Sequence, residues 1–154
     1  QWMKAHGGAM VNIIADMWRS VVEMGHSGAA RAGMMSFTET AAVEWGPDGV
    51  RVNAVAPGWI MSSGFDTYDD PETRKRFSEM PNFVPLKRIG TEAELSAAIA
   101  FLLSPAASFI TGSSIRVDGG VPNTCVNIAL PEGESRVEPY EGFHRAVKPS
   151  VLDE

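Results

Sequence analysis

Ser27 and Arg31 are the residues of this sequence best placed to do chemistry. They lie in the stretch HSGAARAG, which opens a long helical pattern just after an apolar run. Arginine keeps its charge, so it can bind hydroxyl groups and stabilise a nearby anion, but it does not donate a proton. The alternative reading is structural: Ser27 would be the N-cap of the helix, and Arg31 would be a surface charge in its first turn.

Two elements would position this pair. The apolar run AMVNIIA (residues 9–15) follows two glycines and predicts a strand that is buried on both faces. After a loop at 16–26, a helix is expected from 27 to 45, because apolar residues recur at spacings of three and four. The apolar face predicted for this helix consists of Ala30, Met34, Phe37, Ala41 and Trp45.

The rest of the chain continues the alternation of strand and helix. Residues 1–6 read as the last turn of a helix, and further strands are predicted at 50–57 and 113–120. One helix begins after Asp70, with a proline in its first turn, and runs to about Met80. Residues 81–90 are expected to be irregular. The last helix begins with a capping box formed by Thr91 and Glu94.

This order of elements is typical of α/β proteins in which helices cover both faces of a parallel sheet. We therefore expect three strands with flanking helices in a doubly wound, Rossmann-like domain that covers residues 1–120. Such sheets usually contain five or more strands, so others are expected upstream of Gln1. Residues 121–154 have little periodicity and several prolines, which indicates an irregular C-terminal tail. Ligands bind at the carboxyl ends of strands in such folds.

Composition argues against several kinds of function. The formal net charge of −6 at pH 7 argues against nucleic acid as a partner. No apolar run reaches the roughly 18 residues of a membrane span, so no membrane contact is expected. No signal peptide or C-terminal peroxisomal tripeptide is visible, and we expect a cytoplasmic protein. The histidines and the single cysteine, Cys125, lack metal-ligand spacing, so no metal is expected.

Five stretches together resemble the C-terminal half of a short-chain dehydrogenase/reductase. They are VNII, HSGAARAG, AAVEWGPDGVRVNAVAPGWI, PLKRIGT and FLLSPAASFITGSSIRVDGG, and the resemblance runs from about residue 2 to residue 120. Within the family, the motifs are most similar to those of peroxisomal trans-2-enoyl-CoA reductases. The 2,4-dienoyl-CoA reductases and terpene-alcohol dehydrogenases are near neighbours. The resemblance implies that NAD(P)H exchanges hydride with a carbonyl or an activated double bond.

The resemblance places Ser27 where the family has its catalytic tyrosine, and Arg31 where it has the neighbouring lysine. The serine of the family falls at Ile14 or Ala15. A serine hydroxyl is too weak an acid to replace tyrosine directly. The implied role of Ser27 and Arg31 is therefore to stabilise a thioester enolate after hydride reaches the β-carbon. Tyr68 is the one tyrosine with a route to the site and is the alternative proton donor.

The resemblance implies NADP or NAD as the cofactor. The backbone at Gly58 would approach the nicotinamide, and glycine would be needed there for that close approach. The residues predicted to bind cofactor are Asn12, Ile13, Arg31, Pro57, Gly58, Ile60 and Ser62. Asn12 has an alternative role as a buried amide that bonds within the protein. No glycine-rich dinucleotide fingerprint occurs, so this part is expected upstream of Gln1 and the chain alone is expected to be inactive.

Three functions remain open on the sequence. The first is reduction of an enoyl-CoA-like or other hydrophobic substrate, the second is a non-catalytic role in subunit assembly, and the third is oxidation of a terpenoid alcohol. Relatives form a two-fold contact through the long helix and the helix before the first strand, which implies a homodimer or homotetramer. Small residues at the start of the long helix would permit close approach: Gly28, Ala29, Ala32 and Gly33.

Overall fold

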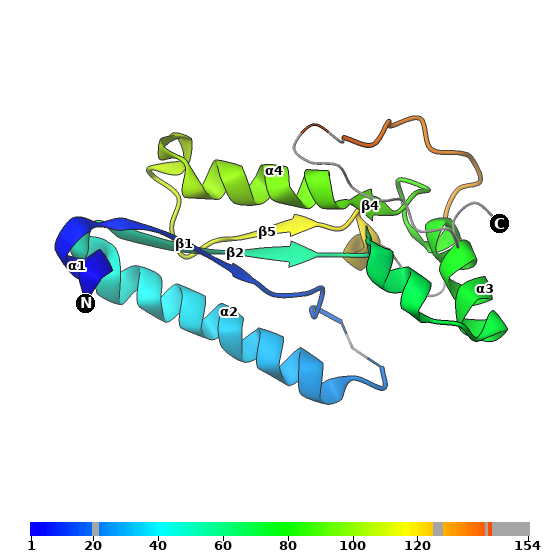
Figure 1. Ribbon diagram of the computed structural model, residues 1–154, viewed down its shortest axis with the longest axis horizontal. Coiled ribbons are helices and arrows are strands. Elements are labelled where there is room, and N and C mark those ends of the chain that lie inside the picture. Colours follow the sequence, from blue (N-terminus) through cyan, green and yellow to red (C-terminus); the bar gives the residue numbers. More distant parts are fainter. Residues whose placement is uncertain (20–21, 125–127, 141, 143–154) are drawn as a thin grey trace. The chain divides into compact units, whose positions relative to one another are not determined.

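The computed structural model describes residues 1–19, 22–124, 128–140 and 142. Figure 1 shows the order of the elements along the chain. They belong to two compact units: unit 1 comprises residues 1–57 and 97–116, and unit 2 comprises residues 58–96 and the described part of 117–154. Cys125 and most of the predicted tail beyond residue 140 lie outside the described residues.

Unit 1 is built on a three-stranded sheet with the strand order β1-β2-β5. β1 (Gly8–Ile13) and β2 (Val50–Pro57) run parallel, and their register places Gly8 opposite Val50. β5 (Ser114–Val117) lies on the other side of β2. The strand predicted at 50–57 is therefore confirmed with the same bounds. The strands predicted at 9–15 and 113–120 are also confirmed, but they are shorter, at Gly8–Ile13 and Ser114–Val117.

Helices flank this sheet. α2 (Gly25–Trp45) lies along one face, and the carboxyl-terminal half of α4 (Glu92–Leu103) lies along the other, as Figure 1 shows. α1 (Trp2–His6) precedes β1 and ends at Gly7, which has a positive φ of 70° that glycine adopts without strain. Short 3-10 helices follow α2 and α4: Gly46–Asp48 and Pro105–Ala107. The predicted α/β fold with a parallel sheet and flanking helices is confirmed.

Burial in unit 1 is concentrated on β2. Five of its residues are fully buried and form the centre of the sheet: Val52, Asn53, Ala54, Val55 and Ala56. The prediction that β1 is buried on both faces is wrong, because its residues are half-buried or exposed. β1 stands at the edge of the described sheet, so it has a neighbouring strand on one side only, whereas β2 has one on each side.

The side of α2 that faces the sheet differs from the predicted one. Its buried residues are Thr38, Ala41 and Ala42, whereas Met34 and Phe37 are exposed. Apolar residues occur all around this helix, so their spacing did not identify a single buried face. The alanines let the helix approach the strand closely, and they pack against β2 together with a few larger side chains. These residues form two clusters. In the first, Met3, Met10 and Trp45 pack against Ala41, Ala42, Val50 and Val52. In the second, Met17 and Met35 pack against Ile14, Ala54 and Ala56.

Two polar residues of β2 fasten the chain that leads into β5. The Arg51 guanidinium donates to the carbonyls of Leu102 at 2.8 Å and Ser104 at 3.1 Å, at the carboxyl end of α4. The buried Asn53 amide donates to the carbonyl of Ile110 at 2.8 Å, and its oxygen accepts from the Ser113 amide at 3.0 Å. Because buried polar groups need partners, these bonds hold the segment between α4 and β5 against β2.

Unit 2 contains a second, very short parallel sheet, in which β3 (Ile60–Met61) pairs with β4 (Gly90–Thr91). β4 and the 3-10 helix Met80–Phe83 lie in the stretch that was expected to be irregular. α3 (Pro71–Glu79) is confirmed, and its N-cap Asp70 accepts from the amide of Thr73 at 2.8 Å. Two further 3-10 helices are Ser63–Thr67 and Val121–Asn123.

The capping box that opens α4 is also confirmed. The Thr91 amide donates to Oε2 of Glu94 at 2.8 Å, and the Glu94 amide donates to the Thr91 hydroxyl at 3.2 Å. Both amides lie at the helix start, where intrahelical partners are lacking. The boundary predicted at residue 120 between the Rossmann-like domain and the tail stays a prediction.

Candidate functional site

The start of α2 lies beside the carboxyl end of β1. The Arg31 Nη1 donates to the carbonyl of Ile13, the last residue of β1, at 3.3 Å. Ser27 lies one helical turn earlier and is half-buried. Residues four apart share a face of a helix, so the hydroxyl and guanidinium groups lie on the same side of α2. The structure therefore places Arg31 against the end of β1, with Ser27 one turn earlier on the same face of α2.

The structural alternative is wrong for Ser27 as an N-cap, whereas Arg31 is an exposed charge, as that alternative predicted, although it does not lie in the first turn. α2 begins at Gly25, and the N-cap position is occupied by Met24, whose side chain makes no capping bond. The carbonyl of Met24 accepts from the amides of Ser27 at 2.9 Å and Gly28 at 3.1 Å, so the first turn closes two residues earlier than expected. Ser27 is the third residue of the helix, and Arg31 lies in its second turn. Neither residue is at a position where it would cap this helix.

Asn12 has a clear structural role. Its Nδ2 donates to the hydroxyl of the buried Thr38 at 2.9 Å, and this hydroxyl donates to the carbonyl of Met34 at 2.8 Å. The amide thus ties β1 to α2, as expected for a polar side chain inside a sheet. Whether Asn12 also contacts cofactor stays a prediction. Ile14, one of the two positions predicted to match the family's serine, is buried and offers no polar side chain.

In unit 2, the turn after β2 is held in place by the turn after β5. The Gly58 amide donates to the carbonyl of Val117 at 2.9 Å. A Cβ atom on Gly58 would lie 2.7 Å from the Asp118 Cα, closer than real Cβ atoms approach. The structure gives a reason within the protein for glycine at this position, and the predicted approach of its backbone to a ligand stays a prediction. Asp118 itself accepts from the Gly120 amide at 2.8 Å, which shapes its own turn.

The remaining predicted cofactor residues follow directly along the chain. Pro57 ends β2, Ile60 begins β3, and Ser62 precedes the 3-10 helix whose Phe65 amide donates to its carbonyl at 3.1 Å. Pro57, Ile60 and Ser62 are all half-buried. Gly58, Ile60 and Ser62 belong to one continuous segment of unit 2, and Pro57 is the last residue of the first segment of unit 1.

Tyr68 packs as an aromatic side chain of unit 2. Its ring meets the Phe77 ring edge-on with centroids 5.3 Å apart, and Phe65 stacks on Phe77 at 4.7 Å. Half of the Tyr68 surface stays exposed. These contacts account for the position of Tyr68, and its role as the alternative proton donor stays a prediction.

Sequence reasoning missed an ion pair at the start of α4. Arg88 donates to Glu94 through two bonds, of 2.8 Å to Oε2 and 2.5 Å to Oε1, and the two side chains are 15% and 19% exposed. Burial raises the pKa of Glu94, but hydrogen bonds from Arg88 and the Thr91 amide outweigh it, so the pKa lies below its ordinary value. The capping box pointed to Glu94. Its pairing with Arg88 depends on the turn between them, in which Lys87 has a positive φ of 55°.

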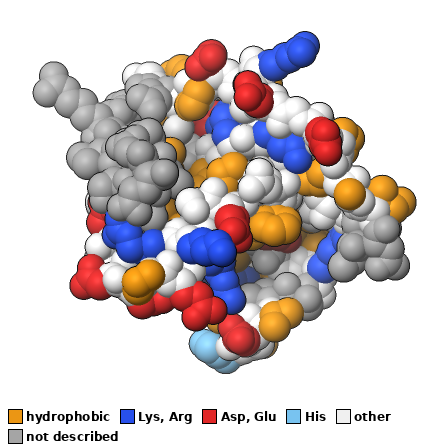
Figure 2. Space-filling model, turned by 90° about the vertical axis from the view of Figure 1, so that its right-hand side faces the viewer, with side chains coloured by type: hydrophobic (Ala, Val, Ile, Leu, Met, Phe, Trp, Pro, Cys, Tyr) orange, Lys and Arg blue, Asp and Glu red, His pale blue; other side chains and the backbone are white. Residues whose placement is uncertain are grey.

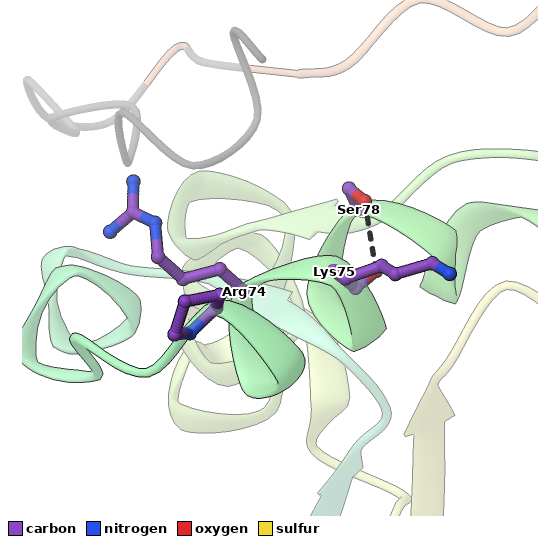
Figure 3. Close-up of a pocket in the computed structure, with 4 residues that line it drawn as sticks. Arg74, Lys75 and Ser78 are labelled. Atoms are coloured by element: carbon purple, nitrogen blue, oxygen red, sulfur yellow. Dashed lines mark hydrogen bonds between the residues drawn. The ribbon is translucent and has the colours of Figure 1, made fainter.

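An open cavity of about 430 Å³ lies along α3, lined by Pro71, Arg74, Lys75 and Ser78. Figure 3 shows that the Arg74 and Lys75 side chains point in different directions, and that the Ser78 hydroxyl bonds to the Lys75 carbonyl. Lys75 also lies 3.9 Å from the Glu79 carboxylate. Figure 2 shows a face on which basic, acidic and hydrophobic side chains are interspersed. The two cations therefore do not converge on one ligand position.

Within the described ranges, no cluster of three or more His, Cys, Asp or Glu side chains has the geometry to hold a metal ion. Over the same part of the chain, no helix combines the length and apolar character needed to cross a membrane.

The parallel sheet, the flanking helices and the polar strand ends define the class of Rossmann-like α/β proteins. A family model described as enoyl-(acyl carrier protein) reductase matches residues 1–122. The chain belongs to the short-chain dehydrogenase/reductase family.

Relatives within this family are similar over most of the chain. A peroxisomal 2,4-dienoyl-CoA reductase from Danio rerio is 42% identical over 82% of this chain and 42% of its own length. A probable 2,4-dienoyl-CoA reductase from Bacillus subtilis is 44% identical, over 73% and 45%. A solved citronellol catabolism dehydrogenase from Pseudomonas aeruginosa PAO1 is 55% identical with a TM-score of 0.64, over 77% and 44%. The chain spans less than half the length of each.

Proposed function

We propose that the protein containing this chain is an NAD(P)H-dependent oxidoreductase that reduces an activated C=C bond of an enoyl-CoA-like substrate. The observation that carries the proposal is the placement of Ser27 and Arg31 on one face of α2, with Arg31 bonded to the carboxyl end of β1. The similarity to 2,4-dienoyl-CoA reductases supports the substrate class.

The residue types favour a double bond over a ketone or an alcohol. Reduction of a ketone needs a proton donor at the forming alcohol, and neither Ser27 nor Arg31 is a competent acid near neutral pH. Reduction of an unsaturated thioester instead places negative charge on the carbonyl oxygen. A guanidinium and a hydroxyl can stabilise that charge by hydrogen bonds, which are worth most in a site that excludes water.

Taken within each unit, the residues at the strand ends carry groups of the kind that bind a nicotinamide nucleotide. A guanidinium has five N–H donors, and in the described part of the chain Arg31 gives one of them to Ile13, which leaves donors for ribose hydroxyls. Gly58, Ile60 and Ser62 would offer backbone groups and a hydroxyl to the carboxamide. When bound, the cofactor supplies the hydride. The motifs in this chain do not account for binding of the pyrophosphate.

A second candidate is an activity in the breakdown of acyclic terpenoids. It is favoured by the 55% identity to the citronellol catabolism dehydrogenase, the highest identity among the relatives described above. The absence of a tyrosine at Ser27 argues against a simple alcohol dehydrogenase. A non-catalytic role in subunit assembly is the third possibility, since the tyrosine and lysine of the family are both replaced.

A substrate panel tests these possibilities. The complete protein is mixed with NADPH or NADH and a trans-2-enoyl-CoA, a 2,4-dienoyl-CoA or citronellal, and with NADP or NAD and citronellol, while the absorbance of the reduced cofactor is followed. We expect cofactor oxidation with the unsaturated thioesters and little change with citronellol. Turnover of citronellol alone would overturn the proposal in favour of the second candidate. No turnover with any substrate, despite measurable cofactor binding, would favour the third.

We also propose a homodimer or homotetramer built on α2. Several large apolar side chains on this helix are exposed, and Val43 is 79% exposed. Phe37 is 44% exposed and lies edge-on to Trp45 with ring centroids 5.8 Å apart. Exposed apolar side chains gathered on one element are typical of subunit contacts. Light scattering that shows only monomer would overturn this proposal.

A further inference from the structure

Residues 137–140 lie against a group of polar side chains in unit 2. The Arg88 Nε donates to the carbonyl of Val137 at 2.9 Å, and the Thr91 hydroxyl donates to the carbonyl of Tyr140 at 2.7 Å. The amide of Tyr140 donates to Oε1 of Glu94 over 3.5 Å. Residues 137–140 are called the strap below, and Arg88, Thr91 and Glu94 are called the dock.

The strap is held by its main chain. All three bonds to the dock end on backbone atoms of the strap, while the side chains of Val137 and Tyr140 remain 50% and 47% exposed. Burial of apolar surface therefore contributes little to its attachment. The side chains of the dock determine where the strap lies.

The dock is organised by bonds of its own. Arg88 and Glu94 form a two-bond ion pair, and Thr91 is almost fully buried. The Thr91 hydroxyl accepts from the Glu94 amide and gives its single proton to Tyr140. A hydroxyl has one proton, so the strap fixes the orientation in which the oxygen lone pairs face the start of α4. The strap thereby completes the hydrogen bonding of the capping box.

The dock reaches β3 through β4. Thr91 belongs to β4, which pairs with β3 so that Gly90 lies opposite Ile60. The Gly90 amide donates to the Trp59 carbonyl at 3.0 Å, and a Cβ atom on Gly90 would lie 2.8 Å from the Ile60 side chain. Two strands of two residues do not form a stable sheet by themselves. The position of β3 therefore depends on what holds β4.

We propose that the strap is a positioning element for residues 60–62, acting through the dock and β4. The functional part rests on the proposed contact of Ile60 and Ser62 with cofactor. The structural part, that loss of the strap loosens β3, does not depend on it. A tail without function would leave β3 and β4 unchanged when removed.

Two truncated chains test the structural part. One ends at Arg136 and lacks the strap, and its control ends at Gly142 and keeps the strap. Hydrogen exchange is measured by mass spectrometry on peptides that cover residues 58–63 and 88–95. We expect exchange about tenfold faster in both peptides for the chain ending at Arg136, because all three hydrogen bonds between the strap and the dock are lost. The control should match the complete chain. Unchanged exchange in residues 58–63 would overturn the proposal.

A second pair of variants keeps the test decisive if the shorter chain does not fold. Thr91→Val removes the hydroxyl and should accelerate exchange in both peptides, whereas Thr91→Ser keeps the hydroxyl and should restore protection. Thr67→Val is the matched control, because the Thr67 hydroxyl bonds to Gly64 within its own turn. Equal exchange in Thr91→Val and Thr91→Ser would contradict the role of the strap contact.

Titration of the complete protein with NADPH separates this proposal from the proposed function. Faster exchange in Thr91→Val with weaker NADPH binding supports both. Faster exchange with unchanged NADPH affinity supports the role of the strap and overturns the proposed cofactor contact of Ile60 and Ser62. Unchanged exchange overturns the role of the strap, whatever the NADPH affinity.

Discussion

Ser27→Ala separates a chemical role of this hydroxyl from a structural one. Ser27 lies inside α2, three residues after the N-cap Met24, and its own amide donates to the Met24 carbonyl. The hydroxyl is therefore not needed to begin the helix. In the proposed reaction it donates to the oxygen that gains negative charge, on the same face of α2 as Arg31.

The expected changes in stability and rate have opposite signs. Alanine has a higher helix propensity than serine, so Ser27→Ala should raise the free energy of unfolding by up to about 0.5 kcal/mol. If Ser27 were an N-cap, the same change would lower it by about 1 kcal/mol, which corresponds to a fall in Tm of about 2–4 °C. Loss of one oxyanion donor should cost about 3 kcal/mol in the barrier, or roughly a hundredfold in kcat.

Thermal unfolding and steady-state oxidation of NADPH with an enoyl-CoA measure both quantities. Ser36→Ala is the matched control, because it makes the same substitution at an exposed position of the same helix. It should leave kcat unchanged. A Ser27→Ala enzyme with full activity would refute the oxyanion role. If Tyr68→Phe were inactive at the same time, Tyr68 would be the proton donor.

Three further variants test the structure around the site. Asn53→Ala should lower the free energy of unfolding by about 1–3 kcal/mol in urea titrations, because it removes the partly buried bonds to the Ile110 carbonyl and the Ser113 amide; a loss below about 1 kcal/mol would mean that water replaces the amide. Gly58→Ala should cost about 1–3 kcal/mol, since its Cβ would meet the Asp118 backbone, and a neutral effect would show that the two turns can separate. The fold lowers the pKa of Glu94, so the ionised carboxylate contributes its full stabilisation at pH values above 4.5, the ordinary pKa of this group. This contribution is lost as the pH falls through the lower pKa of the folded state. Arg88→Gln should therefore destabilise the protein most above about pH 5, and the difference should shrink in more acidic urea titrations; a difference independent of pH would contradict the pairing.

Local signals predicted the elements that depend on neighbouring residues. The bounds of β2 followed from its valine-rich run between turns, and the start of α3 followed from Asp70 and Pro71. The capping box of α4 followed from the types and spacing of Thr91 and Glu94. Each of these features is decided within a few residues, so sequence reasoning could reach it.

Features that depend on distant residues were not predicted. The buried face of α2 was assigned wrongly because only contact with β2 selects the side of Thr38 and Ala41. Arg88 gave no local sign that it binds both Glu94 and the strap.

The candidate site shows the same division between local and distant signals. The spacing of Ser27 and Arg31 placed them on one face of a helix. The start of that helix at Gly25 was missed, because Met24 is not a residue type that favours N-caps. The bond from Arg31 to the carbonyl of Ile13 joins residues 18 apart, and no pattern in the sequence indicates it.

The bonds made by Asn53 have a consequence for the order of folding. They join residues 57 and 60 positions apart, so the intervening chain, including α3 and α4, must be closed into a loop before the amide finds its partners. The parallel pairing of β1 and β2 also spans a long crossover, but α2 can bring these strands together by local helix formation. We therefore expect α2 with β1 and β2 to assemble early and β5 to add late. Until then, one edge of β2 stays open to pairing with another chain, which makes the interval before β5 docks the period of greatest risk of aggregation.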